Sequence, residues 1–329
     1  MISNQTQVSV VIPTYNRAGD LERCLIALSK QTYQYFEIII IDNGCTDNTF
    51  NILQRYPVRV VKDLTRNITH LFNTGWQESK SDIIAFTNDD AEPDKEWLQN
   101  IMVTFKKYED AGAVGGPTIL PKSIINNQEM LRLHQESKRN ILLKIPAWIY
   151  EFFVLEGKYQ KIGVLCESGA YSVGGSLLES TKLNRPIFVD LLSITNVAIK
   201  RHVLEQLNGL DENFRFTHGD GDLFIRIKNS GYKLIFDPKA IVLHHVNPIG
   251  DTRGAFWRGR DQAYFLRKCI RPKSFSGKVR LLLNVIFFNL YWIYKSIEMR
   301  NFAFLEGISG FLRGYFDYYN INRQKDNRL

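Results

Sequence analysis

The stretch VSVVIPTYN, residues 8–16, is an apolar and largely β-branched run that is broken by Pro13. It predicts a buried strand that ends in a loop. Helical spacing comes directly afterwards, and the apolar positions of one helix face are Leu21, Cys24, Leu25 and Leu28. This order of strand and then helix recurs along the first third of the chain and decides the fold.

Further strands are predicted over 36–43, 58–63, 82–90 and 111–117, with helices between them over 44–56, 67–80 and 92–108. The last helix is expected to hold Pro93 in its first turn, beside acids that favour a helix start. Strands that are apolar throughout suit a parallel sheet covered on both faces. The expected fold class is therefore α/β, with a doubly wound, mostly parallel sheet flanked by helices.

Polar side chains stand where three of these strands end. Thr14 and Tyr15 follow the first strand, Asp42 ends the second, and the run NDD at 88–90 ends the fourth. Ligands of open α/β sheets bind outside the carboxyl ends of the strands. Adjacent carboxylates repel and lose hydration on burial. A divalent cation held by the two acids is one interpretation, and an acidic helix start is the other.

The middle of the chain is less regular. Residues 120–185 predict a loop-rich insertion over the site, and its aromatic stretch 142–159 has no clear periodicity. Three of its aromatic side chains could stack on an acceptor sugar or form a core or lid cluster. They are Trp148, Tyr150 and Phe152.

Regularity returns after residue 189. A helix over 200–207 is expected to end at Gly209, and a helix over 220–230 at Gly231. Strand-like runs are present at 232–238 and 240–245.

Charge and cysteine content limit the partners and the cellular setting that are expected. The chain has 42 Lys and Arg against 34 Asp and Glu, a formal net charge of +8. The basic excess gathers in 253–280, which anionic lipid or a diphosphate explains better than nucleic acid, so no nucleic-acid partner is expected. Four separated cysteines without a CxxC motif predict reduced thiols, no zinc knuckle and a cytoplasmic setting. No signal peptide is visible.

Common cofactor and nucleophile motifs are missing from the sequence. The first strand leads into PTYNR rather than GxGxxG, which argues against a Rossmann dinucleotide site, and there is no GxxxxGK[ST], GxSxG or HExxH. The acidic strand end remains. Carboxylates there suit a hard cation such as Mg²⁺ or Mn²⁺, which usually also binds substrate phosphates. A diphosphate-bearing substrate is therefore implied.

With these motifs, the chain resembles the inverting glycosyltransferases of family 2, which have the GT-A fold. The segments 8–33, 36–49 and 86–98 are similar to the nucleotide-binding half of that family, and 196–214 and 220–245 to its acceptor half. The likeness includes rhamnosyltransferase-like bacterial or archaeal members, and it runs from Val8 to about His245.

The resemblance implies roles for the donor side of the site. Pro13, Thr14 and Tyr15 would line the nucleotide, and Asp42 would hold the base or ribose. Arg66 is a further candidate for a phosphate or base contact, or a solvated surface arginine. For Asp42 the alternative is a turn former.

The family's DXD motif falls on residues 88–90. Asn88 stands in place of the first acid, and the resemblance implies that Asp89 would support the site and Asp90 would bind the metal. His244 matches a histidine that contacts the metal in some members; a strand-end residue with satisfied hydrogen bonds is the alternative. An amide is a weaker ligand for a hard metal, so reduced metal affinity is expected.

Asp220 matches the second acid of the family's acidic pair, which serves as general base, while Gly219 stands in place of the first acid. A helix N-cap is the alternative for Asp220.

The resemblance also divides the chain. A catalytic domain over 1–250 would contain a nucleotide-sugar half, 1–118, the insertion, 119–188, and an acceptor half, 189–250. Residues 251–329 would form a basic, amphipathic helical region. The run LLLNVIFFNLYWIY at 281–294 is short for a membrane span, so peripheral membrane contact through 281–320 is expected. Packing on the catalytic domain, or a dimer contact, is the alternative.

The function expected is a metal-dependent inverting hexosyl transfer from a UDP or dTDP sugar to a glycan or lipid-linked acceptor, in polysaccharide or cell-wall synthesis. The protein would be cytoplasmic and peripheral at the inner face of the membrane. Two alternatives remain. One is a nucleotide-sugar binding protein that is degenerate at Asn88 and Gly219. The other is a nucleotidyltransferase, a class that usually has a Gly-rich, basic first loop.

Overall fold

The computed structural model describes residues 6–121, 141–172, 174–246 and 254–326. The chain forms two compact units. The first comprises Met1–Pro121, Val173–Glu212 and Leu223–Asn247, and the second comprises Lys122–Ser172, Asn213–Asp222 and Pro248–Leu329. The domain boundary expected at residue 250 stays a prediction. The second unit nevertheless joins most of the insertion and the segment 213–222 to the C-terminal region.

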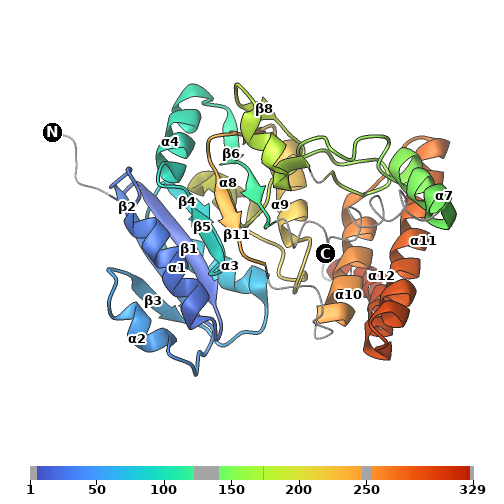
Figure 1. Ribbon diagram of the computed structural model, residues 1–329, viewed down its shortest axis with the longest axis horizontal. Coiled ribbons are helices and arrows are strands. Elements are labelled where there is room, and N and C mark those ends of the chain that lie inside the picture. Colours follow the sequence, from blue (N-terminus) through green and yellow to red (C-terminus); the bar gives the residue numbers. More distant parts are fainter. Residues whose placement is uncertain (1–5, 122–140, 173, 247–253, 327–329) are drawn as a thin grey trace. The chain divides into compact units, whose positions relative to one another are not determined.

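The first unit is built on an eight-stranded sheet with the order β3-β2-β1-β4-β9-β6-β10-β8 (Figure 1). The strands are β1 (Val8–Thr14), β2 (Phe36–Asp42), β3 (Arg59–Lys62), β4 (Ile83–Phe86), β6 (Ala111–Gly115), β8 (Ile187–Phe188), β9 (Val197–Lys200) and β10 (Lys233–Phe236). Only β9 and β8 run antiparallel to their neighbours. The predicted mostly parallel sheet is confirmed.

Burial follows the apolar pattern of the sequence. Every residue of β1 and β4 is buried, as expected for strands covered on both faces. Helix α1 (Ala18–Ser29) buries the four apolar positions that its spacing predicted. Helix α3 (Ile68–Glu78) packs directly on β1, because a Cβ added at Gly75 would lie 2.1 Å from Val11 Cγ1. The remaining helices that contribute to this unit are α2 (Thr49–Leu53), α4 (Trp97–Lys107), α8 (Arg201–Leu207) and most of α9 (Gly219–Asn229).

Strand register brings the predicted polar ends together. Thr14 pairs with Asp42 across β1 and β2, and Val11 pairs with Phe86 across β1 and β4. Residues 88–90 therefore leave β4 at the same edge at which β1 ends. This edge carries the predicted donor site.

Pro93 lies in a strand, so its prediction as part of a helix start was wrong. Residues Ala91–Pro93 form β5, which pairs with β11 (Val242–His244), and β7 (Thr118–Ile119) completes a second, three-stranded sheet. Helix α4 begins only at Trp97, after a turn in which Asp94 Oδ1 accepts from the backbone N–H of Glu96. Backbone pairing with β11, which is distant in sequence, outweighs the local helix-start signal.

Part of the insertion is more regular than predicted. Helix α7 (Ile141–Ile149) contains Pro146 and continues as a π-helical segment, Tyr150–Val154, where the sequence predicted irregular chain. Residues 155–172 and 174–185 are loops with short 3₁₀ turns at Gly174–Ser176 and Leu178–Lys182, as predicted. Residues 122–140 of the predicted insertion lie outside the described residues.

Helices dominate the C-terminal part of the second unit. They are α10 (Ala255–Cys269), α11 (Phe275–Glu298) and α12 (Glu306–Asp326), drawn orange to red in Figure 1. Glycines allow α10 and α12 to touch backbone to backbone, because a Cβ at Gly310 or Gly314 would lie 2.0 Å from a carbonyl oxygen of α10. Within the described ranges, no helix has both the length and the apolar content to cross a membrane.

Candidate active site

Asp89 and Asp90 lie just after β4, and each residue is only 6% exposed. Thr14, at the end of β1, donates its hydroxyl to Asp89 Oδ2 at 2.8 Å. Burying two adjacent carboxylates costs free energy unless cations or donors compensate for the lost water. The site is therefore defined by the groups that compensate these two charges.

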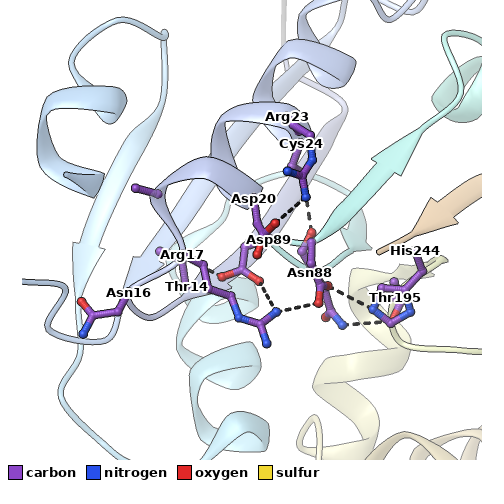
Figure 2. Close-up of polar contacts among 12 residues, drawn as sticks. Thr14, Asn16, Arg17, Asp20, Arg23, Cys24, Asn88, Asp89, Thr195 and His244 are labelled. Carbon is purple, nitrogen blue, oxygen red and sulfur yellow. Dashed lines mark hydrogen bonds and ion pairs between the residues drawn. The ribbon is translucent and has the colours of Figure 1, made fainter. Parts of the chain in front are cut away.

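Arg17, immediately before α1, supplies one positive charge. Its Nη1 lies 2.6 Å from Asp90 Oδ2 and 3.4 Å from Asp89 Oδ1, and Figure 2 shows the guanidinium beside Asp89. Arg17 is not among the site residues predicted from the sequence. The available signal was its place in PTYNR, because a cation that follows β1 reaches the same sheet edge as the acids that follow β4.

His244 reaches the acids from the small sheet. It pairs with Ala91 across β11 and β5, and its Nε2 lies 3.0 Å from Asp90 Oδ1. Asn88 is oriented by Thr195, whose Oγ1 accepts from the Asn88 amide at 3.1 Å (Figure 2). The structure thus brings together the predicted residues Asn88, Asp89, Asp90 and His244.

The two carboxylates differ in proton affinity. Burial raises the pKa of Asp89 to about 6, against the lowering effects of Arg17 and the Thr14 hydrogen bond. Burial acts in the same direction on Asp90, but the hydrogen bond and charge of His244, together with Arg17, outweigh it and lower the pKa of Asp90. Asp90 is therefore the acid that stays ionised over the wider pH range, as a cation ligand must.

The residues at this edge fit a divalent cation that also takes ligands from elsewhere. Asp90 Oδ1 and His244 Nε2 are 3.0 Å apart, close to the separation of two ligands set at right angles ~2.1 Å from Mg²⁺. Among the residues that the structure describes, no three His, Cys, Asp or Glu side chains are grouped to hold a metal. Mg²⁺ commonly completes such a sparse protein shell with water and substrate phosphates.

Asp42 closes a turn at the end of β2. Its Oδ1 accepts from the backbone N–H groups of Gly44 at 3.1 Å and Cys45 at 2.8 Å, and Gly44 has a φ of +81°. The turn-forming alternative for Asp42 is therefore observed. A carboxylate has several acceptor positions, so a nucleotide contact stays a prediction beside it.

The other donor-side candidates differ in accessibility. Tyr15 is 44% exposed, and the Arg66 guanidinium lies 4.0 Å from its ring centroid, within cation–π range. Arg66 Nη1 also lies 3.5 Å from Asn43 Oδ1. Pro13 is buried within β1 beside Ile41. Tyr15 and Arg66 together form an accessible stacking surface, whereas Pro13 does not contribute to it.

Asp220 stands in the first turn of α9 and belongs to the second unit, whereas all the other predicted site residues belong to the first. Its Oδ1 accepts from the backbone N–H of Gly221 at 2.9 Å, so it acts locally as a helix-start acid. Asp222, two residues further on, is 1% exposed and lies 2.6 Å from Lys268 Nζ.

The aromatic candidates of the insertion form a cluster. Trp148 and Phe152 have ring centroids 5.6 Å apart and are each about half exposed, while Tyr150 meets Phe287 at 5.4 Å. Tyr150 therefore packs on α11, and the other two rings face solvent.

Comparison with known proteins places part of the sequence in a family. The family model described as "Glycosyl transferase family 2" matches residues 9–170. The glycosyltransferase AglE of Haloferax volcanii is 33% identical over 107 residues, 30% of this chain and 35% of that protein. The probable glycosyltransferase YdaM of Bacillus subtilis is 23% identical over 299 residues, 88% of this chain and 61% of that protein.

A solved structure extends the likeness to the fold. The mannosyltransferase PcManGT from Pyrobaculum calidifontis, in complex with GDP-Man and Mn²⁺, superposes with a TM-score of 0.57 at 17% identity, over 96% of this chain and 88% of that one. The sheet and its acidic strand end thus define an α/β protein of the GT-A class. Within that class, residues 9–170 carry a glycosyl transferase family 2 domain.

Proposed function

We propose that the chain is a metal-dependent, inverting glycosyltransferase. It would transfer a sugar from a nucleoside diphosphate donor to a glycan or a lipid-linked acceptor. The chain spans only about a third of AglE and about three fifths of YdaM, so the activity of either relative is no more than a guide.

One observation carries this proposal. The ends of β1 and β4 and the strand β11 gather two buried carboxylates, an arginine and a histidine at the sheet edge where α/β proteins bind ligands. Such a cluster has little structural purpose, because desolvating adjacent acids is unfavourable. A diphosphate with a bound cation is the ligand that matches it.

Asp90 and His244 would hold the cation, and the amide oxygen of Asn88 would be a weaker ligand. When bound, a divalent cation supplies Lewis-acid stabilisation of the charge that develops on the leaving diphosphate. Arg17 lies within 2.6 Å of Asp90 and is suited to donate to the same diphosphate. Tyr15 and Arg66 would stack on and contact the nucleotide.

Asp220 would act as the general base. A sugar hydroxyl has a pKa far above 7, so its proton must pass to a base as the new bond forms. The proton would move to the Asp220 carboxylate while the hydroxyl oxygen attacks the anomeric carbon opposite the diphosphate. The glycosidic bond forms as the bond to the diphosphate breaks, which inverts the anomeric centre without a covalent enzyme intermediate.

Release of nucleoside diphosphate from a panel of UDP, dTDP and GDP sugars, with Mn²⁺ and a mixture of acceptors, tests the proposal. Asp220→Asn should lower transfer by at least a hundredfold and leave donor binding unchanged. Wild-type protein that binds a donor and transfers to no acceptor would favour the degenerate binding protein. Release of pyrophosphate from a nucleoside triphosphate and a sugar phosphate would favour the nucleotidyltransferase.

We also propose peripheral contact between α11 and a membrane at the cytoplasmic face. Helix α11 exposes many apolar side chains and buries several small or polar ones, which is the reverse of the usual distribution. Most of its exposed positions are apolar, namely Phe275, Val279, Leu282, Ile286, Leu290, Ile293 and Ile297, and the others are Ser276 and Lys278 in the first turn and Tyr294 near the end. Its buried positions are largely small or polar: Gly277, Asn284, Trp292, Lys295 and Ser296. A helix that exposes its apolar face to water requires a cover.

The spacing and the charges of this face favour a lipid surface over a second copy of the chain. From residue 275 to 297 the stripe repeats about every 3.7 residues, whereas a left-handed coiled coil requires 3.5. Exposed basic residues border the ends of the helix at Lys273, Lys278 and Arg300. An apolar stripe flanked by cations is the pattern of helices that lie in the plane of an anionic bilayer.

A further inference from the structure

Helix α10 lies outside both the predicted catalytic domain and the family match, yet one of its faces contacts the segment 213–222 along its length. The contacting side chains recur at helical spacing and are Asp261, Gln262, Phe265, Lys268 and Cys269. All these residues and the segment belong to the second unit. The segment carries the proposed base, Asp220, so the inference rests on the proposed function.

Asp261 makes the most specific of these contacts. Its Oδ2 accepts from three consecutive backbone N–H groups, those of Arg215 at 3.0 Å, Phe216 at 2.7 Å and Thr217 at 3.0 Å. The Asp261 side chain is completely buried. Three successive N–H groups that converge on one oxygen form an anion-binding nest, here filled by a carboxylate of the protein itself.

The remaining contacts fix the residues that come after the nest. The ring of His218 stacks on Phe265 with centroids 5.1 Å apart and 19° between the planes, although His218 has a φ of +63°, which is unfavourable for a residue with a side chain. A Cβ added at Gly221 would lie 3.2 Å from the Phe265 ring. At the far end of the segment, Asp222 lies 2.6 Å from Lys268 Nζ. Asp220 is thus held between two anchored positions.

A second layer holds Asp261 in turn. Arg260 Nη1 donates to Asp261 Oδ1 at 3.0 Å and to the carbonyl of Asn213, and Arg260 Nε donates to Asp317 Oδ2 of α12 at 3.0 Å. Arg260 is almost fully buried. Helix α12 is thereby connected to the segment through a continuous chain of charged hydrogen bonds.

We infer that Asp261 is a positioning residue for the transfer reaction, which sets the orientation of the Asp220 carboxylate by fixing the backbone of residues 215–217. The C-terminal helices are then part of the catalytic apparatus. A positioning residue of this kind affects the rate of transfer and leaves donor affinity unchanged, because the donor contacts come from the first unit.

Asp261→Asn tests this inference. The amide keeps the shape of the carboxylate but removes its charge, and its NH₂ group then faces either the nest or Arg260, both of which are themselves donors. The kcat for transfer should fall about 10- to 100-fold, with the KM and calorimetric Kd for the donor within twofold of wild type. Each measured rate is divided by the concentration of protein that binds donor, so that unfolded molecules do not lower the kcat.

Asp237→Asn is the matched control. It removes the charge of another buried carboxylate, in the first unit, which accepts from the Thr104 hydroxyl and the Lys239 backbone N–H and has no part in the nest or the segment 215–217. It should lower thermal stability to a similar extent and leave kcat within twofold of wild type. Equal kcat losses in the two variants, or an unchanged kcat in Asp261→Asn, would overturn the inference.

If Asp261→Asn does not fold, Phe265→Leu replaces it, because leucine keeps an apolar side chain under His218 but removes the stacked ring. A several-fold loss of kcat at constant donor affinity is expected, and an unchanged kcat would overturn the inference. The proposed function is judged separately. It fails if wild-type protein shows no transfer, or if Asp220→Asn retains full activity.

Discussion

Arg17 determines how two adjacent carboxylates coexist at the end of β4. It neutralises part of the charge of Asp89 and Asp90, and its side chain keeps 35% of its surface exposed, so it can change partners without leaving a buried cation behind. A bound divalent cation would take over the same electrostatic task. Arg17 and a cation should therefore substitute for one another in stabilising the folded protein.

Arg17→Gln tests that exchange. In the presence of EDTA the variant should be less stable than wild type by about 1–2 kcal/mol, below the value for a fully buried pair because Arg17 is partly exposed. Mn²⁺ should restore much of the loss, measured by urea denaturation with and without the metal. Arg23→Gln removes an exposed arginine of α1 that pairs with Asp20, and should show no such recovery. Equal losses with and without Mn²⁺ in Arg17→Gln would contradict the exchange.

His70 gives a prediction about pH. Its Nδ1 lies 2.8 Å from Glu212 Oε2 and its Nε2 lies 3.1 Å from Asp63 Oδ2. The hydrogen bond with Glu212, together with the charges of both acids, raises the pKa of His70 above its ordinary value in spite of partial burial. A raised folded-state pKa stabilises the protein fully below the unfolded-state value near 6.5, and this stability is lost as the pH rises through the folded-state value.

His70→Gln should therefore reduce the free energy of unfolding at pH 5.5 by up to about 1 kcal/mol, since the pair is partly exposed and screened. The difference from wild type should shrink at pH 8.5, measured by urea denaturation at both values. A difference that grows with pH would show that the ion pairs do not stabilise the fold.

At the scale of elements, the close approach of α10 and α12 depends on glycine. A Cβ at Gly314 would lie 2.0 Å from the carbonyl oxygen of Arg260 and 2.8 Å from its carbonyl carbon, so one backbone would have to move. Gly314→Ala should destabilise the protein by about 1–3 kcal/mol in thermal or urea unfolding. Gly19→Ala in α1, where nothing lies within 4 Å of the added Cβ, should be neutral or slightly stabilising. Equal stability of the two variants would contradict the packing described.

Helix α11 provides the test of membrane contact. Leu282→Glu and Ile286→Glu place charges in its apolar stripe at exposed positions, so folding should be preserved. Each should reduce sedimentation with vesicles that contain about a third phosphatidylglycerol by several-fold. Val103→Glu, the same kind of change at an exposed position of α4, is the control. Wild-type protein that binds no vesicles and forms a dimer broken by the α11 variants would favour a second copy as the cover.

The elements also show how far the sequence predicts the fold. Periodic apolar runs predicted β1, β2, β4 and α1 correctly, because local pattern and burial agree there. Pro93 was misplaced because its strand pairs with β11, about 150 residues away, and no local signal reports such a partner. The π-helical segment after α7 was missed for a related reason, since the ring of Tyr150 packs on Phe287 of α11, which is distant in sequence.

The candidate site could be predicted to a similar degree. The strand ends predicted that Thr14, Asp42 and residues 88–90 share one edge of the sheet, and the structure places Asp89 beside Thr14 and Asp90 beside His244. The roles assigned to these residues stay predictions. Arg17 and Asp261 were not assigned roles, because their importance lies in partners far away in sequence. The turn closed by Asp42 was recognised from its residue type only as an alternative.

For the whole molecule, the proposed chemistry is divided between two units. The donor and metal candidates belong to the first unit, and the proposed base belongs to the second, together with α10, α11 and α12. The C-terminal helices would then serve both the reaction, through Asp261, and the approach to a lipid-linked acceptor, through the apolar face of α11. Both roles depend on the claim that the acidic strand end binds a cation with a nucleoside diphosphate.

Isothermal calorimetry of UDP, dTDP and GDP, each with Mn²⁺ and with EDTA, tests that claim most directly. One nucleotide should bind wild-type protein at least tenfold more tightly with Mn²⁺, and Asp90→Asn should abolish that difference. GDP is included because the similar mannosyltransferase holds GDP-Man and Mn²⁺. Binding that is equally tight with EDTA, or no binding under any condition, would contradict the claim and leave Asp89 and Asp90 as a pair of acids compensated by Arg17 and His244.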